Sequence, residues 1–244
     1  MKKFLTITLL IMSIFSSRAH FPQETFSAPA GGTVTISFIH HASIAISYNG
    51  TLIQVDPVMK LGEETADYNK FKKADFILIT HHHYDHLSMT TIEEIRGKKT
   101  SIILDPTSFE ELEEGTVIRN GESLTLSKDI SLEAVPAYNI TEDRLQFHPK
   151  GRDNGYILTV GGLRIYISGD TEDIPELASL KDIDVAFLSA NQPFTMTPEQ
   201  CVRAAGMFSP KVLIPYHLSD TDTSLIAEGL ADSGIDVRLH PELK

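Results

Sequence analysis

The chain has 244 residues, of which 41% are hydrophobic and 22% are charged, an ordinary globular composition that is long enough for one domain with a large core. The formal net charge is −12, and an acidic surface repels phosphate backbones, which argues against a nucleic-acid partner. The one cysteine, Cys201, excludes an intrachain disulfide, and its helical surroundings favour core packing over a catalytic thiol.

The first nineteen residues differ in composition from the rest of the chain. A basic start, MKK, precedes the apolar run FLTITLLIMSIFSS, and Ser17 and Ala19 place small residues before a cleavage point at His20. This pattern predicts a signal peptide over residues 1–19 and a periplasmic or secreted protein with no membrane attachment after cleavage. The alternative is an uncleaved anchor, although the apolar run is short for a membrane span. Cleavage would remove three cations and move the net charge from −12 to −15.

Residues 20–32 are expected to form a mobile leader, and a single domain is expected over residues 33–244. The domain opens with three predicted strands over residues 33–39, 42–48 and 51–56. An Asn-Gly pair between the second and third is a strong hairpin signal. The polar segment 58–73 is long enough to be a rim loop. The near-continuous apolar run ADFILIT, residues 74–80, is typical of a strand covered on both faces.

The rest of the chain alternates between predicted strands and short helices. Helices are expected over residues 89–97, 174–180, 197–208 and 224–234. Strands are expected over residues 100–105, as three short strands within 116–135, and over 155–160, 163–168, 184–189, 211–216 and 235–239. Each half contains a strand–turn–strand unit followed by an aspartate, Asp56 in the first and Asp170 in the second. Two similar halves predict two sheets packed face to face with helices outside, with the chemistry at strand ends where loops converge.

Four histidines and one aspartate lie within six positions directly after the apolar strand, in the stretch THHHYDHL. Positions i and i+2 of an extended segment face the same side, so His81 and His83 can bind one metal ion together. Asp85 and His86 follow after the chain turns and can approach a second ion. Imidazole and carboxylate groups suit zinc, and also manganese or iron. The stretch therefore predicts a metal site rather than a solvated histidine-rich loop.

The pattern HxHxDH after an apolar strand resembles the signature of the metallo-β-lactamase superfamily. Further segments follow in the family's order: a hairpin ending at Asp56, the segment YISGDT with Asp170, and the segment IPYH with His217. The resemblance runs from about Thr33 to the C-terminus and implies an α+β fold, a four-layer αββα sandwich. The segments HHAS, PAYN…HPKG and GDTEDIPEL further resemble the branch that includes ascorbate-6-phosphate lactonase-like proteins.

The resemblance implies a centre of two divalent ions, with Asp170 bridging them. The first two histidines of the cluster would bind one ion, and the aspartate and last histidine of the cluster would bind the other together with His217. His148 is the one histidine between the cluster and Asp170, and we assign it to the first ion. The alternative is that His148 binds substrate while Asn139 or water completes the shell. The full set of predicted ligands is His81, His83, Asp85, His86, His148, Asp170 and His217.

Two more residues are expected close to these ligands. His41 sits at a strand boundary, where it could orient a ligand or be an ordinary buried histidine. Asp56 is expected to orient a ligand imidazole or a loop rather than to bind metal.

These residues lead to the hypothesis of a metal-dependent hydrolase with a small-molecule substrate. Two ions would lower the pKa of a shared water, and Asp85 could hold this nucleophile and shuttle its proton. The resemblance favours a lactone or a related ester over a β-lactam, because the true β-lactamases of the superfamily lack the aspartate that Asp170 resembles. A phosphodiesterase is the next hypothesis, since Lys150 and Arg152 could meet an anionic group, although they could equally be solvated loop charges. A non-catalytic metal-containing binding protein is a third, and the sequence indicates no oligomeric state.

Overall fold

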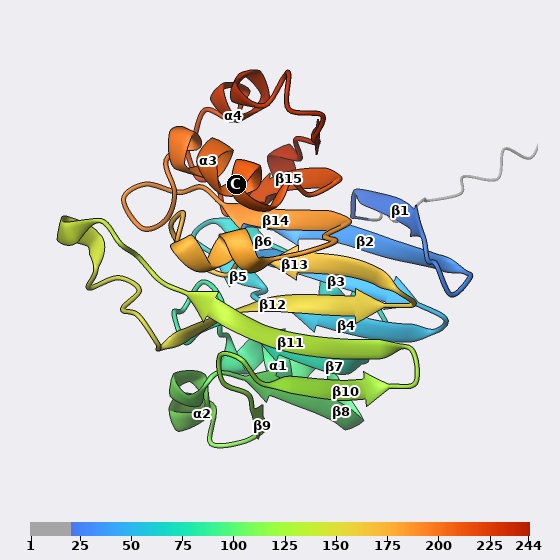
Figure 1. Cartoon of the computed structure of the whole chain (residues 1–244). Coiled ribbons are helices and arrows are strands. Elements are labelled where there is room, and N and C mark those ends of the chain that lie inside the picture. The colour runs from blue at the N-terminus through green and yellow to red at the C-terminus, as the bar shows by residue number, and fades with distance from the viewer. Residues whose placement is uncertain (1–20) are drawn as a thin grey trace, which may run out of the picture.

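The structure is a computed structural model that describes residues 21–244, so the predicted signal peptide and His20 lie outside the described residues. Two seven-stranded sheets pack face to face, the first built from the N-terminal half and the second from the C-terminal half (Figure 1). In sheet order, the first contains β1 (Gln23–Ser27), β2 (Thr33–His40), β3 (Ser43–Tyr48), β4 (Thr51–Val55), β7 (Ala74–Ile79), β8 (Arg96–Leu104) and β9 (Thr116–Val117). The second contains β10 (Ser123–Ser127), β11 (Ile130–Ala137), β12 (Asp153–Val160), β13 (Leu163–Ile167), β14 (Val185–Ser189), β15 (Val212–Tyr216) and β16 (Asp236–Val237).

The remaining elements connect the strands and cover the outer faces of the sheets. A small hairpin pairs β5 (Lys60–Leu61) with β6 (Glu64–Thr65). The α-helices are α1 (Met89–Ile95), α2 (Pro106–Leu112), α3 (Pro198–Phe208) and α4 (Ser224–Gly229). The 3₁₀ helices are η1 (Tyr68–Lys70), η2 (Glu142–Arg144), η3 (Pro175–Ser179) and η4 (Pro241–Leu243).

Three hydrophobic cores separate the layers. The central core lies between the two sheets, where the Phe38 and Phe187 rings lie 6.4 Å apart. A second core packs the outer face of the second sheet against α3, with Tyr166 edge-on to Phe208. The third packs the outer face of the first sheet against α1 and η1. Helices therefore cover both outer faces, which confirms the predicted four-layer αββα sandwich.

The predicted hairpin at Asn49-Gly50 is confirmed. Both residues have positive φ, 47° and 80°, as a type I′ turn requires, and they join β3 to β4 in an antiparallel pair. β4 and β7 are parallel, as are β13, β14 and β15, so in each sheet the carboxyl ends of these strands meet at one edge. The loops that carry the predicted site residues leave from these edges.

The mobile leader expected over residues 20–32 is not what the structure shows. Residues 23–27 form β1, which pairs antiparallel with β2 from Gln23↔Ser37 to Ser27↔Thr33. Phe26 packs against the central core, and Glu24 pairs with Arg238 and His240 near the C-terminus. The residues that contact β1 near the C-terminus lie far away in the sequence, so the five residues of β1 alone do not predict these contacts.

Two predicted helices are shorter or tighter than expected. Residues 174–180 form the 3₁₀ helix η3 instead of an α-helix, and the last predicted helix, over 224–234, ends at Gly229. Within residues 21–244, no helix combines the length and the apolar character needed to cross a bilayer.

Candidate metal centre

The predicted site residues converge from loops of both sheets. His41 lies in the turn between β2 and β3, and the cluster from His81 to His86 follows β7. His148 lies in the loop between β11 and β12, Asp170 follows β13, and His217 follows β15. The loops that carry these positions leave the sheets at strand ends, so the rigid sheets place the loops and the loops supply the side chains.

The first group consists of His81, His83, His148 and Asp170, whose ligand atoms all lie within 4.8 Å of one another. His81 Nε2 lies 3.1 Å from His83 Nδ1, and His148 Nε2 lies 3.3 Å from Asp170 Oδ2. His81 and His148 are buried, and His83 is partly exposed. The structure thus places His148 beside the first histidines, where a ligand role was predicted for it.

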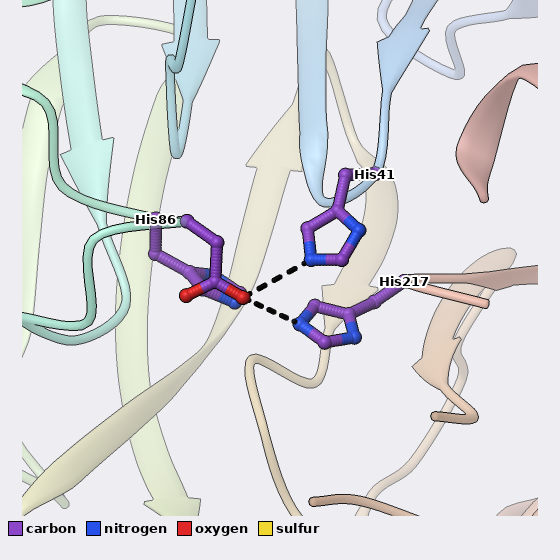
Figure 2. Close-up of side chains that lie close together, drawn as sticks. His41, His86 and His217 are labelled. Carbon is purple, nitrogen blue, oxygen red and sulfur yellow. Dashed lines mark hydrogen bonds and ion pairs between the residues drawn. The ribbon is translucent and has the colours of Figure 1, made fainter. Parts of the chain in front are cut away.

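The second group consists of His41, Asp85, His86 and His217, also within 4.8 Å of one another. Asp85 Oδ2 lies 3.2 Å from His41 Nε2 and 3.4 Å from His217 Nε2. Figure 2 shows His41 and His217 pointing at this same carboxylate oxygen from two different loops. His41 was expected to stand beside the ligands, whereas the structure places its ring nitrogen among them.

Asp170 lies between the two groups. Its Oδ2 lies 3.4 Å from His217 Nε2 and 3.3 Å from His148 Nε2, and its Oδ1 lies 3.4 Å from His86 Nε2. Among the described residues, Asp170 Oδ1 and the Nε2 atoms of His86 and His217 are buried and have no hydrogen-bond partner. Buried polar atoms are rarely left unpaired. These unpaired nitrogen and carboxylate atoms face one another, and their chemistry fits the ligands of divalent metal ions.

A buried aspartate fixes the orientation of the histidines after β7. Asp56 Oδ2 accepts a hydrogen bond from His86 Nδ1 at 2.8 Å, and the backbone N–H and hydroxyl of Thr80 donate to the same carboxylate at 2.8 and 2.7 Å. The Thr80 hydroxyl oxygen, 3.0 Å from His81 Nδ1, can accept the proton of that nitrogen. The Nε2 atoms of His81 and His86 then keep their lone pairs for a metal ion. The predicted orienting role of Asp56 agrees with this contact.

A second aspartate, Asp153, supports His148 and was not singled out in the sequence. Its Oδ2 accepts from His148 Nδ1 at 3.0 Å, so Nε2 of that ring faces the metal centre. Arg152 donates to both Asp153 oxygens, at 2.6 and 2.9 Å, and to the Phe147 carbonyl at 2.7 Å. Arg152 therefore fixes the position of Asp153, which in turn orients the predicted ligand His148. The only local signal was an aspartate five residues after a candidate ligand.

Asn139, the alternative ligand, is held by two neighbouring loops through its amide nitrogen. Its Nδ2 donates to the Arg144 carbonyl at 3.1 Å and to the Phe194 carbonyl at 2.8 Å, so it joins two loops. The geometry favours His148 over Asn139 for completing the first group. Lys150 is also engaged elsewhere, with Tyr138 Oη and Glu176.

Burial and neighbouring charges shift the pKa values of the site histidines in different directions. Burial and nearby histidines lower the pKa of His81 well below 6.5 and that of His83 to about 4, so both rings are neutral, as metal ligands must be. Burial acts in the same direction on His86, but the carboxylates of Asp170 and Asp56 outweigh it and raise its pKa.

The Asp85 carboxylate stays ionised. Burial alone would raise its pKa, but the nearby imidazoles of His217 and His41, 3.4 and 3.2 Å away, and the charge of His86 hold it well below the usual range for an aspartate. A carboxylate that stays ionised can accept a hydrogen bond but is a weak base. Holding a water molecule thus suits Asp85 better than shuttling its proton.

Three residues of the site adopt left-handed backbone conformations. His41, Asp56 and His217 have φ values of 51°, 42° and 53°. Such conformations are uncommon outside glycine, and Asp and His tolerate them better than most residues. The surrounding strands hold the backbone in these conformations, which aim the side chains into the centre.

The groups open onto a cavity of about 960 Å³. Its walls include residues 61–64 at the β5–β6 hairpin, which are part of the segment 58–73 predicted to be a rim loop, and the loop residues Phe147 and Phe194. A cavity of this volume can hold a small molecule against the metal centre.

The family described as Beta-lactamase superfamily domain matches residues 35–217, three quarters of the chain and every residue of the two groups. The chain belongs to the metallo-β-lactamase superfamily. Its relatives in the superfamily include UPF0173 metal-dependent hydrolases, and the chain is a member of this family. The relative from Geobacillus thermodenitrificans is 32% identical over 196 residues, covering 75% of this chain and 84% of the relative. The relative from Lysinibacillus sphaericus is 28% identical over 218 residues, covering 83% and 95%.

One solved structure agrees with this family assignment, and a second, more distant one shares the fold. A crystal structure of a protein from Parabacteroides distasonis, described as a metal-dependent hydrolase, is 51% identical, with a TM-score of 0.88 over 92% of this chain and 100% of the other. Igni18, a metallo hydrolase from Ignicoccus hospitalis, shares the fold at 21% identity, with a TM-score of 0.73 over 87% and 97% of the two chains. The prediction of a metal-dependent hydrolase is confirmed at this level. The resemblance to the ascorbate-6-phosphate lactonase-like branch stays a prediction.

Proposed function

We propose that this metallo-β-lactamase superfamily member is a two-metal hydrolase that cleaves a small-molecule lactone or a related ester. The observation that carries the proposal is Asp170, whose carboxylate faces both ligand groups within 3.3–3.8 Å of four histidines. A carboxylate in this position can ligate an ion on either side. It is also the residue that resembles the bridging aspartate of superfamily members acting on lactones, thioesters and phosphodiesters.

The ligand chemistry supports zinc, with manganese and iron as alternatives, because the two groups offer imidazoles and carboxylates and no thiolate. His81, His83 and His148 would hold one ion, and Asp85, His86 and His217 the other, with His41 able to join the second. Ions bound there would lower the pKa of a water molecule and polarise the substrate carbonyl.

The protein side chains have separate tasks in the proposed reaction. Asp85 lines the cavity, stays ionised and can accept a hydrogen bond from the attacking water. Asp56 and Asp153 keep the imidazoles of His86 and His148 in the tautomer that leaves Nε2 free. Phe147 and Phe194 form an apolar part of the cavity wall beside the proposed site of the substrate.

Substitution of Asp170 tests the proposal. We expect D170N to lower metal content from about two ions per chain and to reduce kcat/KM by 10²-fold or more, because the shared ligand loses its charge. Metal content is measured by mass spectrometry after dialysis, and activity on a panel of lactones, carboxylic esters, thioesters, phosphodiesters and β-lactams. The matched control is D173N in the same segment, whose carboxylate contacts Gln200 and Arg203 instead of the centre. Full metal content and activity in D170N would contradict the proposal.

We also propose that the protein is exported, on the basis of the apolar N-terminal sequence followed by small residues. Cell fractionation with N-terminal sequencing tests this, and we expect a mature chain that begins at His20. A cytoplasmic protein that retains Met1–Ala19 would contradict it.

A further inference from the structure

The cavity over the metal centre carries negative charge at its rim. Outside the two ligand groups, its lining includes the carboxylates of Glu63, Glu64 and Asp220, all of them exposed. Among the described residues that line it, Lys244 is the one lysine or arginine. A substrate therefore passes three carboxylates and one ammonium group on its way to the ions.

These rim charges are largely unneutralised. In the part of the chain that the structure describes, neither Glu63 nor Asp220 forms an ion pair, and Glu64 has only a 3.7 Å approach to His40 Nδ1. Glu63 and Glu64 lie at the β5–β6 hairpin, and Asp220 lies in the turn after β15. The carboxylates thus come from connections that leave both seven-stranded sheets, and they line the same cavity.

The two cations that could have received an anionic group are engaged elsewhere. The Arg152 guanidinium donates to both oxygens of Asp153, which neutralises its charge, and its remaining approach within the site is to His83 Nε2 at 3.4 Å. Lys150 donates to Tyr138 Oη and Glu176 and does not line the cavity. The expectation that these two residues meet an anionic group finds no support in their contacts.

One wall of the cavity is aromatic. Phe147 and Phe194 pack edge to face with their ring centroids 5.0 Å apart, and 41% of Phe194 remains exposed. Asn139 fixes the wall by donating to the Phe194 carbonyl from the loop that carries Phe147. Tyr84, with 79% of its surface exposed, also lines the cavity. Exposed aromatic rings held in place offer an apolar group a surface away from water.

We propose that the cavity selects esters or lactones that carry no negative charge and that place an apolar group against Phe147 and Phe194. This inference rests on the proposed function, since the reacting carbonyl must lie at the metal centre. The ions receive that carbonyl, whereas the rim meets the rest of the substrate. Carboxylates at the rim disfavour a phosphate or carboxylate there and tolerate a neutral or cationic group.

A matched substrate series tests the charge selection. The series is 4-nitrophenyl butyrate and two analogues of similar length whose acyl chains end in a trimethylammonium or a carboxylate group. We expect kcat/KM for the carboxylate analogue to be at least about tenfold lower than for the other two at low salt, with the gap narrowing in 0.5 M sodium chloride. Equal kcat/KM for the anionic and neutral esters would overturn the proposal.

Charge variants link the selection to the rim. The penalty is the ratio of kcat/KM for the neutral ester to kcat/KM for the anionic ester. In the triple variant E63Q/E64Q/D220N we expect this penalty to decrease several-fold, mainly through a lower KM for the anionic ester. The control is D129N, an exposed carboxylate at the opposite end of β11 from the site, which should leave the penalty unchanged. A penalty that stays the same in the triple variant would contradict the role of these carboxylates.

The apolar wall is tested separately. F194A should reduce the preference for 4-nitrophenyl butyrate over the acetate several-fold, and an unchanged preference would remove Phe194 from the proposal.

Binding experiments separate this inference from the proposed function. Hydrolysis-resistant ketones with the same three end groups are titrated into the metal-loaded protein by calorimetry. Weaker binding of the anionic ketone without ester hydrolysis would support the selection and overturn only the hydrolase proposal. Hydrolysis with equal binding of all three ketones would overturn only the selection.

Discussion

Asp56 shows how a residue that touches no substrate can control a metal ligand. Its buried carboxylate accepts from His86 Nδ1 and from both the backbone and the hydroxyl of Thr80. Three donors converge on two oxygens, so the imidazole can neither flip nor change tautomer without breaking a buried hydrogen bond. The position of His86 Nε2 toward Asp170 follows from this arrangement.

The substitution D56N should weaken metal binding about 10- to 100-fold while preserving the fold. Asparagine has the same shape and tolerates the φ of 42° at this position, but its amide presents a donor where Thr80 and His86 also donate. The measurement is a competition titration with a chelator, with circular dichroism to check the fold. The control is D75N, at the other end of β7, where the carboxylate contacts Leu52 N and Lys72. Wild-type metal affinity in D56N would show that the contact has no orienting role.

The sequence revealed part of this site because four candidate ligands fall within six positions after one strand. Asp170 and His217 could be found because each follows an apolar strand in a recognisable segment. The roles of Asp153 and Arg152 could not be predicted, because they depend on which way the His148 ring faces. The same holds for His41, whose approach to Asp85 joins two loops separated by more than forty residues.

At the scale of elements, the loop between β11 and β12 is held by one buried glutamate. Glu172 Oε2 accepts from the backbone N–H groups of Ile140 and Thr141, each at 2.7 Å, and Oε1 accepts from Arg144 Nη1 at 3.2 Å. This loop carries His148 and Phe147, which line the cavity. The position of a ligand and of the aromatic wall therefore depends on a carboxylate in the loop after β13.

We expect E172Q to lower the free energy of unfolding by about 1–3 kcal/mol at pH 7, because the new amide meets backbone donors in a buried place. Burial would raise the pKa of Glu172, but its hydrogen bonds outweigh burial and lower it. A carboxyl group whose pKa is lower in the folded than in the unfolded protein stabilises the fold at pH values above the unfolded-state pKa. This stabilisation is lost as the pH falls through the folded-state pKa. The difference in the free energy of unfolding between wild type and E172Q should therefore be largest at pH 7 and decrease below about pH 4.

Urea unfolding at several pH values, with chelator present throughout, measures this difference without a contribution from metal loss. Hydrogen exchange should rise in residues 138–152 of the variant. E176Q, which changes a nearby glutamate at the surface, should cost much less at pH 7. A difference between wild type and E172Q that grows at low pH would contradict the assigned role.

Strand positions were predictable where their patterns are local. The Asn49-Gly50 turn and the buried runs of β7 and β14 carry their own signals of alternation, turn chemistry or continuous apolarity. The strand β1 carries none, because its stability comes from pairing with β2 and from Glu24 contacting the C-terminal region. Propensity within a short segment cannot report a partner that lies far along the chain.

At the scale of the whole molecule, each ligand group joins the two sheets. The first group takes His81 and His83 from loops of the first sheet, and His148 and Asp170 from loops of the second. In the second group, His217 comes from the second sheet and the other three residues from the first. An ion in either group would therefore link the two halves of the sandwich at one edge of the central core.

Metal removal should consequently lower the thermal stability of the entire domain. An ion that binds only the folded state adds about 2.7 kcal/mol when its free concentration is 100 times Kd. For a domain of this size, 1 kcal/mol corresponds to about 2–4 °C, so each site should add roughly 5–10 °C to the midpoint of unfolding. Differential scanning fluorimetry against buffered free zinc measures this. H83A should abolish the increment of the first site and H217A that of the second, since His83 and His217 belong to different groups. A midpoint that does not change with chelator would show that the ions do not link the sheets.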